Sequence, residues 1–159
     1  MALFGSTTFE SNAFGWRPVY QVPSVTAGVL ADTSARTGGY VLRASSTVVD
    51  GSVAVDGWAE LSGPADVVLE LTVGAFAWVR AAPGHNSCSC SLVIHQLGLP
   101  SDSNKSEARF TVGNDWTLIT NVLTFRTGEI PTESNVQYRV EFYLKSPNVP
   151  LDIDSVIIT

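Results

Sequence analysis

A series of short apolar segments separated by turn residues is the feature that most limits how this chain can fold. Within residues 136–145, Val140, Phe142 and Leu144 alternate with more polar side chains that can face solvent. This alternation is typical of a strand with one buried face. No window of about eleven residues keeps a helical apolar period with caps. Segments of this strand-like kind occupy residues 40–44, 67–73, 76–81, 90–97, 116–126, 136–145 and 151–158.

The composition agrees with an all-β domain. Val, Ser and Thr together make up nearly a third of the 159 residues, and β-branched side chains suit pleated sheets better than helices. Hydrophobic residues account for 45% of the chain, enough for a sizeable core and too many for a disordered polypeptide. Roughly eight or nine short strands, with no linker or internal repeat, predict one β-sandwich or barrel domain over residues 1–159.

The charge balance limits the possible partners. The formal net charge is −6, and the nine Lys and Arg residues are spread singly along the sequence. A nucleic-acid-binding protein needs a basic face that neutralises phosphates, and anionic membranes attract the same kind of surface. We therefore expect neither nucleic acid nor a membrane as a partner, whereas neutral ligands and cations are compatible with this chain.

Catalytic motifs are absent from the sequence. It contains no Gly-x-Ser-x-Gly elbow, no phosphate-binding P-loop and no His-Glu-x-x-His. A Ser-His-Asp triad or a pair of glycosidase carboxylates depends on spatial arrangement, so the sequence leaves both open. Without a motif, we expect the protein not to be an enzyme.

The two cysteines, Cys88 and Cys90, are one residue apart. In a strand both side chains point to the same side, and a disulfide between them would be strained. His85 and His95 form no metal-ligand spacing with them. The pattern favours two small buried residues or free thiols.

Six segments resemble, in order, the jelly-roll carbohydrate-binding modules of families 4, 9 and 22. The segments are Phe9-Glu10 with Gly15-Trp16, Thr37-Gly38-Gly39-Tyr40-Val41-Leu42, Gly74 to Arg80, Trp116 to Phe125, Val140 to Pro147, and Ile153-Asp154-Ser155-Val156. The match spans nearly the whole chain and keeps the order of the family pattern. It implies an antiparallel two-sheet β-sandwich with jelly-roll topology.

The resemblance also implies a function. Such a module is noncatalytic, and it would bind a polysaccharide of the xylan or β-glucan type in a groove on the concave sheet. It would target a covalently attached hydrolase to its substrate outside the cell. The sequence shows no signal peptide, and its abrupt ends suggest a module from a longer chain.

The family pattern further implies a structural calcium ion near the two chain ends. Its carboxylate ligands map onto Glu10 and Asp154, and backbone carbonyls near Thr8 and Gly39 would complete the shell. Ca²⁺ takes six to eight oxygen ligands and tolerates irregular geometry. The family often carries a second Asp where this chain has Ser155. If no ion binds, Glu10 and Asp154 are solvated or capping carboxylates.

The expected sugar-binding side chains are those that alternation turns away from the core. If Ala77 and Val79 face the core, Trp78 and Arg80 point the other way. The same reasoning on residues 136–145 places Glu141 and Tyr143 outward, and Trp58 falls roughly where xylan-binding relatives carry a stacking Trp. Arg80 and Glu141 could equally form a cross-strand ion pair.

Two of the four tryptophans are expected to have packing roles. Trp116 should lie in the core and Trp16 in the core or against a loop. The stretch from Ser45 to Glu60 is poorer in aromatic residues than in good sugar binders of the family. The alternative function is therefore a structural or protein-interaction β-sandwich of a surface, adhesin or phage-tail protein that binds no sugar.

Overall fold

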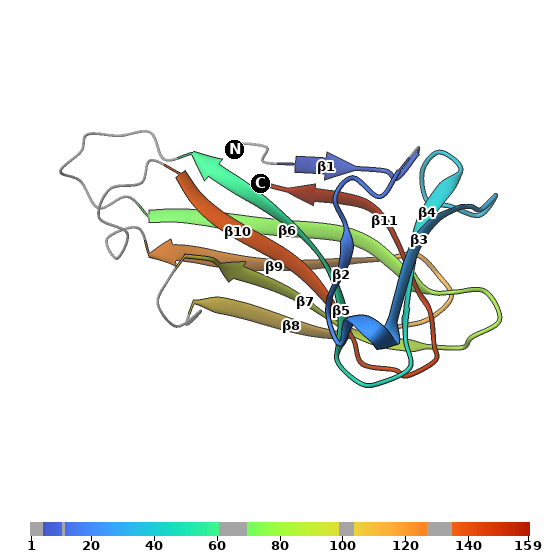
Figure 1. Cartoon of the computed structure of the whole chain (residues 1–159). Coiled ribbons are helices and arrows are strands. Elements are labelled where there is room, and N and C mark those ends of the chain that lie inside the picture. Colours follow the sequence, from blue (N-terminus) through green and yellow to red (C-terminus); the bar gives the residue numbers. More distant parts are fainter. Residues whose placement is uncertain (1–4, 11, 61–69, 99–103, 127–134) are drawn as a thin grey trace.

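The computed structural model describes residues 5–10, 12–60, 70–98, 104–126 and 135–159. These residues form eleven strands and one short 3-10 turn, η1 (Val22–Ser24), arranged as two stacked sheets (Figure 1). Residues 67–69, the start of one expected strand, lie outside the described residues. No helix in the described part of the chain is long and apolar enough to cross a membrane.

The strands divide into two antiparallel sheets. Sheet A has the order β3-β4-β11-β6-β9, with β1 also paired to β11, and sheet B has the order β2-β5-β10-β7-β8. The strands of sheet A are β1 (Gly5–Thr7), β3 (Val25–Ala31), β4 (Tyr40–Ser46), β6 (Glu70–Ala81), β9 (Thr117–Arg126) and β11 (Leu151–Ile158). Those of sheet B are β2 (Arg17–Tyr20), β5 (Gly51–Glu60), β7 (Cys88–Gln96), β8 (Lys105–Val112) and β10 (Asn135–Leu144). The predicted antiparallel two-sheet sandwich is confirmed.

One strand is longer than the sequence predicts. The pattern places separate strands on either side of Gly74, whereas β6 runs through this residue. The Gly74 N–H donates to the Thr159 carbonyl at 2.7 Å, and its carbonyl accepts from the Thr159 N–H at 2.9 Å. A Cβ at position 74 would lie 3.1 Å from the Phe76 ring. Gly74 therefore allows Phe76 and Thr159 to approach, and it does not end the strand.

The core lies between the sheets and follows the predicted alternation. Val140, Phe142 and Leu144 on β10 are fully buried. Trp16 packs beside them, with its ring centroid 5.4 Å from that of Phe142 and 6.5 Å from that of Phe9. The expected core role of Trp16 is thus confirmed.

The cysteine prediction is also confirmed. Cys88 and Cys90 on β7 are free and buried on the inner side of sheet B. Burial raises the pKa of the Cys88 thiol to about 11 and that of the Cys90 thiol to about 12. Since the thiolate is the reactive form, both residues act as small core residues at neutral pH.

The two ends of the described chain lie side by side. β1 pairs antiparallel with β11, with Gly5 opposite Ile158 and Thr7 opposite Val156. The register of β11 against β6 shifts between Asp154 and Ile157, which is a bulge that re-aims nearby side chains. The pairing confirms that the first and last segments are neighbours.

We expect Phe142→Ala to lower the free energy of unfolding by about 3–5 kcal/mol, because it leaves a cavity beside Trp16. Urea unfolding monitored by circular dichroism measures the change. The control is Val122→Ala, since Val122 is 57% exposed on β9, and it should change stability by less than about 0.5 kcal/mol. Equal effects of the two substitutions would contradict this description of the core.

Candidate functional site

The structure does not place the five expected sugar-binding residues on one face. Trp58, Glu141 and Tyr143 belong to β5 and β10 of sheet B, whereas Trp78 and Arg80 belong to β6 of sheet A. All five side chains point away from the inter-sheet core, as alternation predicts. They nevertheless lie on opposite outer surfaces of the sandwich, so a cross-strand pair between Arg80 and Glu141 is also excluded.

The outer surface of sheet B carries three of these residues among many polar groups, and we call it the polar face. Trp58 lies opposite Gln137 and Tyr143 lies opposite Ser52 in the pairing of β5 with β10. The six steps along the strand from Gln137 to Tyr143 span roughly 20 Å at ~3.3 Å per residue, the length of a short oligosaccharide. The polar face comprises Arg17, Tyr20, Ser52, Asp56, Trp58, Ser91, His95, Glu107, Arg139, Glu141, Tyr143 and Lys145.

Asp56 holds two arginine side chains in one half of the polar face. Its carboxylate accepts hydrogen bonds from Arg139 Nε at 2.7 Å and from Arg17 at 3.1 Å. The hydrogen bond from Arg139 is the main cause of the lowered pKa of Asp56, and burial opposes it. Arg17 remains about half exposed, so it can turn its guanidinium toward a ligand.

Glu141 lies in the middle of the polar face and is held there by hydrogen bonds. It is 2% exposed, its Oε2 lies 2.8 Å from His95 Nε2, and its Oε1 accepts from the Ser52 hydroxyl. Burial alone would raise the pKa of Glu141, but the hydrogen bonds from His95 and Ser52, aided by the charges of His95 and Arg139, lower it overall. The carboxylate is therefore held ionised and fixed in position.

Tyr143 marks the other end of the face. Its ring centroid lies 6.3 Å from that of Tyr20, which is half exposed, and Lys145 Nζ lies 5.4 Å from the Tyr143 ring. Burial, followed by the charge of Glu141, raises the pKa of Tyr143 to about 12. The phenol thus stays a neutral hydroxyl.

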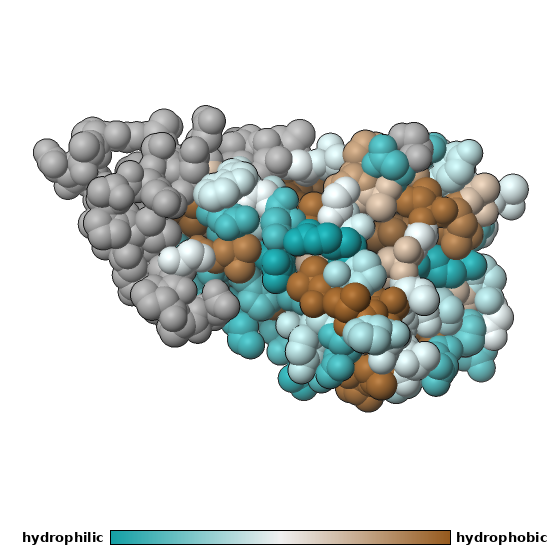
Figure 2. All heavy atoms as spheres, viewed as in Figure 1, coloured by the Kyte–Doolittle hydropathy of each residue, from teal (hydrophilic) through white to brown (hydrophobic). Residues whose placement is uncertain are grey.

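The polar face suits a neutral polyhydroxylated ligand. Guanidinium groups donate hydrogen bonds, carboxylates accept them, and imidazole and phenol can do either. The charges are matched in local pairs, so the face offers directional partners without a large excess of either sign. Figure 2 shows hydrophilic atoms gathered where β5 and β10 cross the middle of the molecule in the view of Figure 1. The exposed Trp58 and Tyr20 supply flat apolar rings at the two ends.

Sheet A holds Arg80 in a buried group of four alternating charges. Arg80 bonds Asp152 at 3.2 Å and Asp32 at 3.0 Å, and Arg43 bonds the same two carboxylates at 2.6 Å and 3.4 Å. Arg80 is only 6% exposed and Asp152 is fully buried. Since breaking a buried pair leaves an uncompensated charge, this group has a structural role.

The segment between β3 and β4 covers this group on the outer side. Arg80 also donates to the Ser34 carbonyl at 3.2 Å, and Trp116 Nε1 donates to the same oxygen at 2.8 Å. Arg80 stacks on the Trp116 ring and Arg36 stacks on the Trp78 ring, each 4.4 Å from the ring centroid. The expectation that Trp116 lies in the core is therefore wrong: it is partly exposed and packs outside sheet A.

The expected calcium ligands Glu10 and Asp154 both border the Thr37-Gly38 turn. A Cβ added to Gly38 would overlap the Glu10 carboxylate. Asp154 Oδ2 accepts from the Thr37 N–H at 2.8 Å, and its Oδ1 accepts from the Ser155 N–H at 2.6 Å. Carboxylates from both ends of the chain therefore lie near one turn, and their binding of calcium stays a prediction.

Asp154 accepts hydrogen bonds from the N–H and hydroxyl groups of both Thr37 and Ser155, and its carboxylate could also bind a cation. Asp154 is fully buried, and within the described residues no Lys, Arg or His lies in ion-pair distance of it. Buried carboxylates normally have a cationic partner or a metal. Phe9 and Ser155 have positive φ angles of 58° and 51°, a strain that often accompanies functional sites.

The expected backbone ligands are the carbonyl groups near Thr8 and Gly39. Thr8 is an exposed residue next to the buried Phe9. The Gly39 carbonyl accepts from the Asp32 N–H at 2.8 Å, so one of its two lone-pair directions is occupied. The described residues contain no group of three or more His, Cys, Asp or Glu placed to hold a metal. Any ion here would depend on carbonyl and hydroxyl oxygens as well as the two carboxylates.

Comparison with known proteins identifies the fold. No protein-family model and no curated protein matches the sequence. Among solved structures, the CBM22-1 xylan-binding domain of Paenibacillus barcinonensis Xyn10C superposes with a TM-score of 0.67 at 16% identity, over 99% of this chain and 93% of that one. The C-terminal family 22 module of Clostridium thermocellum Xyn10B gives 0.63 at 16% identity, over 99% and 93%.

A third match comes from another carbohydrate-binding family. TmCBM61, solved with β-1,4-galactotriose, superposes with a TM-score of 0.56 at 13% identity, over 96% of this chain and 94% of that one. The chain thus has the jelly-roll fold of carbohydrate-binding modules. This confirms the fold that the motif resemblance implied.

We expect Glu141→Gln to be less stable than the parent protein at pH 7, by about 1–3 kcal/mol, because it weakens two buried hydrogen bonds. The folded-state pKa of Glu141 is lowered, so its stabilising effect is present above about pH 4.5 and is lost as the pH falls through that lowered pKa. The stability difference should therefore shrink at pH 3.

Urea unfolding of both proteins at pH 7 and pH 3 measures this difference. Asp115→Asn is the control, since Asp115 is exposed, and it should leave stability nearly unchanged at both pH values. A difference for Glu141→Gln that stays constant or grows toward pH 3 would contradict the ionised, hydrogen-bonded state of Glu141.

Proposed function

We propose that this protein is a noncatalytic carbohydrate-binding module that binds a polysaccharide chain of the xylan or β-glucan type along the polar face of sheet B. The observation that carries the proposal is the fixed array of ionised and hydroxyl side chains around Asp56 and Glu141, with exposed aromatic rings at either end. The fold shared with xylan- and galactotriose-binding modules supports it.

Binding would use groups that are already in position. The Arg17 guanidinium and the Trp58 ring are exposed, whereas Glu141 and Asp56 are held by protein partners. A ligand hydroxyl would add one hydrogen bond to the partly exposed Asp56 carboxylate without disturbing its existing pairs. Because the side chains are already ordered, little conformational entropy is lost on binding.

The module would act by raising the local substrate concentration for an attached hydrolase. One matching structure, from Clostridium thermocellum Xyn10B, contains a CBM22-1 module and a GH10 module in one chain complexed with xylohexaose. By analogy we place this chain outside the cell, as a covalent neighbour of a catalytic module.

The alternative, a structural or protein-interaction sandwich, is not favoured. A protein-binding surface has a core depleted in charged residues, whereas the centre of the polar face holds Asp56, Arg139, His95 and Glu141. The matching structures named above are described as sugar-binding.

The proposal includes a structural Ca²⁺ held by Glu10 and Asp154 near the Thr37-Gly38 turn. Their placement at the same turn supports it, as does the burial of Asp154 with no cationic partner among the described residues. The bound ion would neutralise these carboxylates and tie the N-terminal segment to β11. Thr8 and Gly39 carbonyls are candidate further ligands.

Trp58→Ala and Tyr143→Ala should each weaken binding of a xylan or β-glucan oligosaccharide at least tenfold, because each removes an aromatic ring at one end of the polar face. Isothermal titration calorimetry of purified variants against xylohexaose and cellohexaose measures the affinity. Tyr40→Ala is the control, since Tyr40 is an exposed aromatic residue on sheet A, and it should bind as the parent does. Absence of saturable binding by the parent protein to either glycan would overturn the proposal.

Chelation with EDTA should lower the melting temperature by about 5–10 °C relative to protein in Ca²⁺ at 100-fold its Kd, because the ion binds only the native state. Glu10 is exposed, so Glu10→Gln should fold and show a smaller response to Ca²⁺. Melting temperatures that do not change with EDTA, in the parent and in Glu10→Gln alike, would defeat the calcium proposal.

A further inference from the structure

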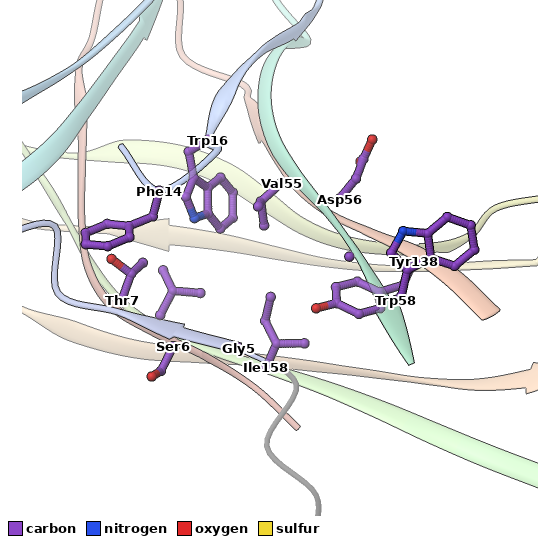
Figure 3. A pocket seen from close by; sticks show the side chains of 12 residues that line it. Gly5, Ser6, Thr7, Phe14, Trp16, Val55, Asp56, Trp58, Tyr138 and Ile158 are labelled. Carbon is purple, nitrogen blue, oxygen red and sulfur yellow. The ribbon is translucent and has the colours of Figure 1, made fainter. Parts of the chain in front are cut away.

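A pocket of about 310 Å³ lies at the edge of the sandwich, beside β5 (Figure 3). Phe14 and Trp16 form one side of it, and Tyr138 and Trp58 lie on the other side, with Val55 between them. Gly5 and Ile158, from the paired ends of the chain, form its base. Its size lies at the lower end of small-molecule sites.

The pocket exists because strand pairing on this side of β5 stops early. β2 pairs with β5 only at Ser52, Val53 and Ala54, and among the described residues no strand follows it along Val55 to Glu60. Gly57 lacks a side chain at this point, and any Cβ there would overlap the Tyr138 ring. The pocket therefore reaches around the free edge of β5, from inward-facing Val55 and Tyr138 to outward-facing Asp56 and Trp58.

The lining combines four aromatic side chains with the side chains of Ser6, Thr7 and Asp56. The hydroxyl of Tyr138 points toward the base, 3.9 Å from the position that a Gly5 Cβ would take. Burial raises the pKa of Tyr138, so this group is a neutral hydroxyl. The carboxylate of Asp56 lies at the outer rim and already accepts from Arg17 and Arg139.

This chemistry differs from that of the polar face. A sugar ring carries hydroxyls around its whole edge, and those that faced Phe14, Trp16 or Val55 would lose their water without gaining a partner. A planar aromatic ring would instead stack or make edge contacts with Phe14, Trp16 and Tyr138. A single hydroxyl on that ring could bond the Tyr138 hydroxyl.

We infer that this pocket binds a hydroxylated aromatic ring, a phenolic group, beside the polar face. Trp58 and Asp56 belong to both surfaces, so such a ring could be an ester substituent on a bound polysaccharide. It could equally be a free phenolic compound. The first source rests on the proposed function, and the second does not.

The test uses the ¹⁵N-labelled protein and methyl 4-hydroxycinnamate, with the four tryptophan indole N–H resonances observed by NMR. Trp16 and Trp58 line the pocket, whereas Trp78 and Trp116 lie on sheet A. We expect saturable shifts of the first pair only, with a Kd of about 1 mM or tighter.

Phe14→Asn should weaken this binding at least fivefold. Phe14 is about half exposed and has a positive φ of 48°, a conformation that Asn tolerates, so the variant should fold. Leu118→Asn is the matched control, since Leu118 is 47% exposed on sheet A, and it should bind the ester as the parent does.

A second arm separates the two sources by comparing xylo-oligosaccharides with and without a 4-hydroxycinnamoyl ester. Tighter binding of the esterified chain, lost in Phe14→Asn, supports a glycan-borne ring. Equal binding of the two chains, or no binding of either, together with retained binding of the free ester, supports a free phenolic ligand. If the Trp16 and Trp58 resonances do not shift with millimolar ester, the inference is overturned whatever the glycans do.

Discussion

The pairing of β10 with strands on both sides is the constraint on which the proposed ligand-binding surface depends. β10 pairs with β5 from Asn135 to Leu144 and with β7 from Tyr138 to Leu144. A strand held on both edges cannot shift its register without moving every side chain to the other face. The same pairing that buries Val140 and Phe142 therefore fixes Arg139, Glu141 and Tyr143 on the outside.

Charged side chains have different roles on the outer surfaces of sheet A and sheet B. On sheet A, Arg80, Arg43, Asp32 and Asp152 satisfy one another beneath the segment that follows β3, so no charge is left for a ligand. On sheet B, Arg17 and Trp58 remain exposed beside the paired carboxylate of Asp56, which is itself partly exposed. The first arrangement fixes a loop to a sheet, whereas the second presents an ordered polar surface to solvent. This contrast is why the ligand is assigned to sheet B.

The sequence predicts the fold class and much of the local orientation. The alternation of Val140, Phe142 and Leu144 correctly identifies the buried side of β10, and it correctly turns Trp78 and Arg80 away from the core. Alternation says nothing about which of two sheets a strand joins, because that depends on pairing between residues far apart in the chain. For this reason the five residues predicted to form one sugar-binding site lie on two opposite surfaces of the sandwich.

Other features of the structure were harder to predict from the sequence. β5 contains two glycines, and its polar residues interrupt the apolar pattern, so the strand that positions Asp56 and borders the pocket was not predicted. Asp56, Arg139 and His95 acquire their importance only from contacts across strands. Trp116 was expected in the core because the matching position in the family is structural, but the guanidinium of Arg80 provides a stacking partner outside sheet A. The proximity of Glu10 and Asp154 to one turn was predictable only through the motif resemblance.

The central claim is that sheet B, and not sheet A, carries the ligand. Mapping backbone amide shifts while ¹⁵N-labelled protein is titrated with a xylan or β-glucan oligosaccharide tests it most directly. The account predicts saturable shifts clustered around Asp56, His95 and Glu141, with the amides near Arg80 unaffected. Shifts confined to sheet A would contradict it.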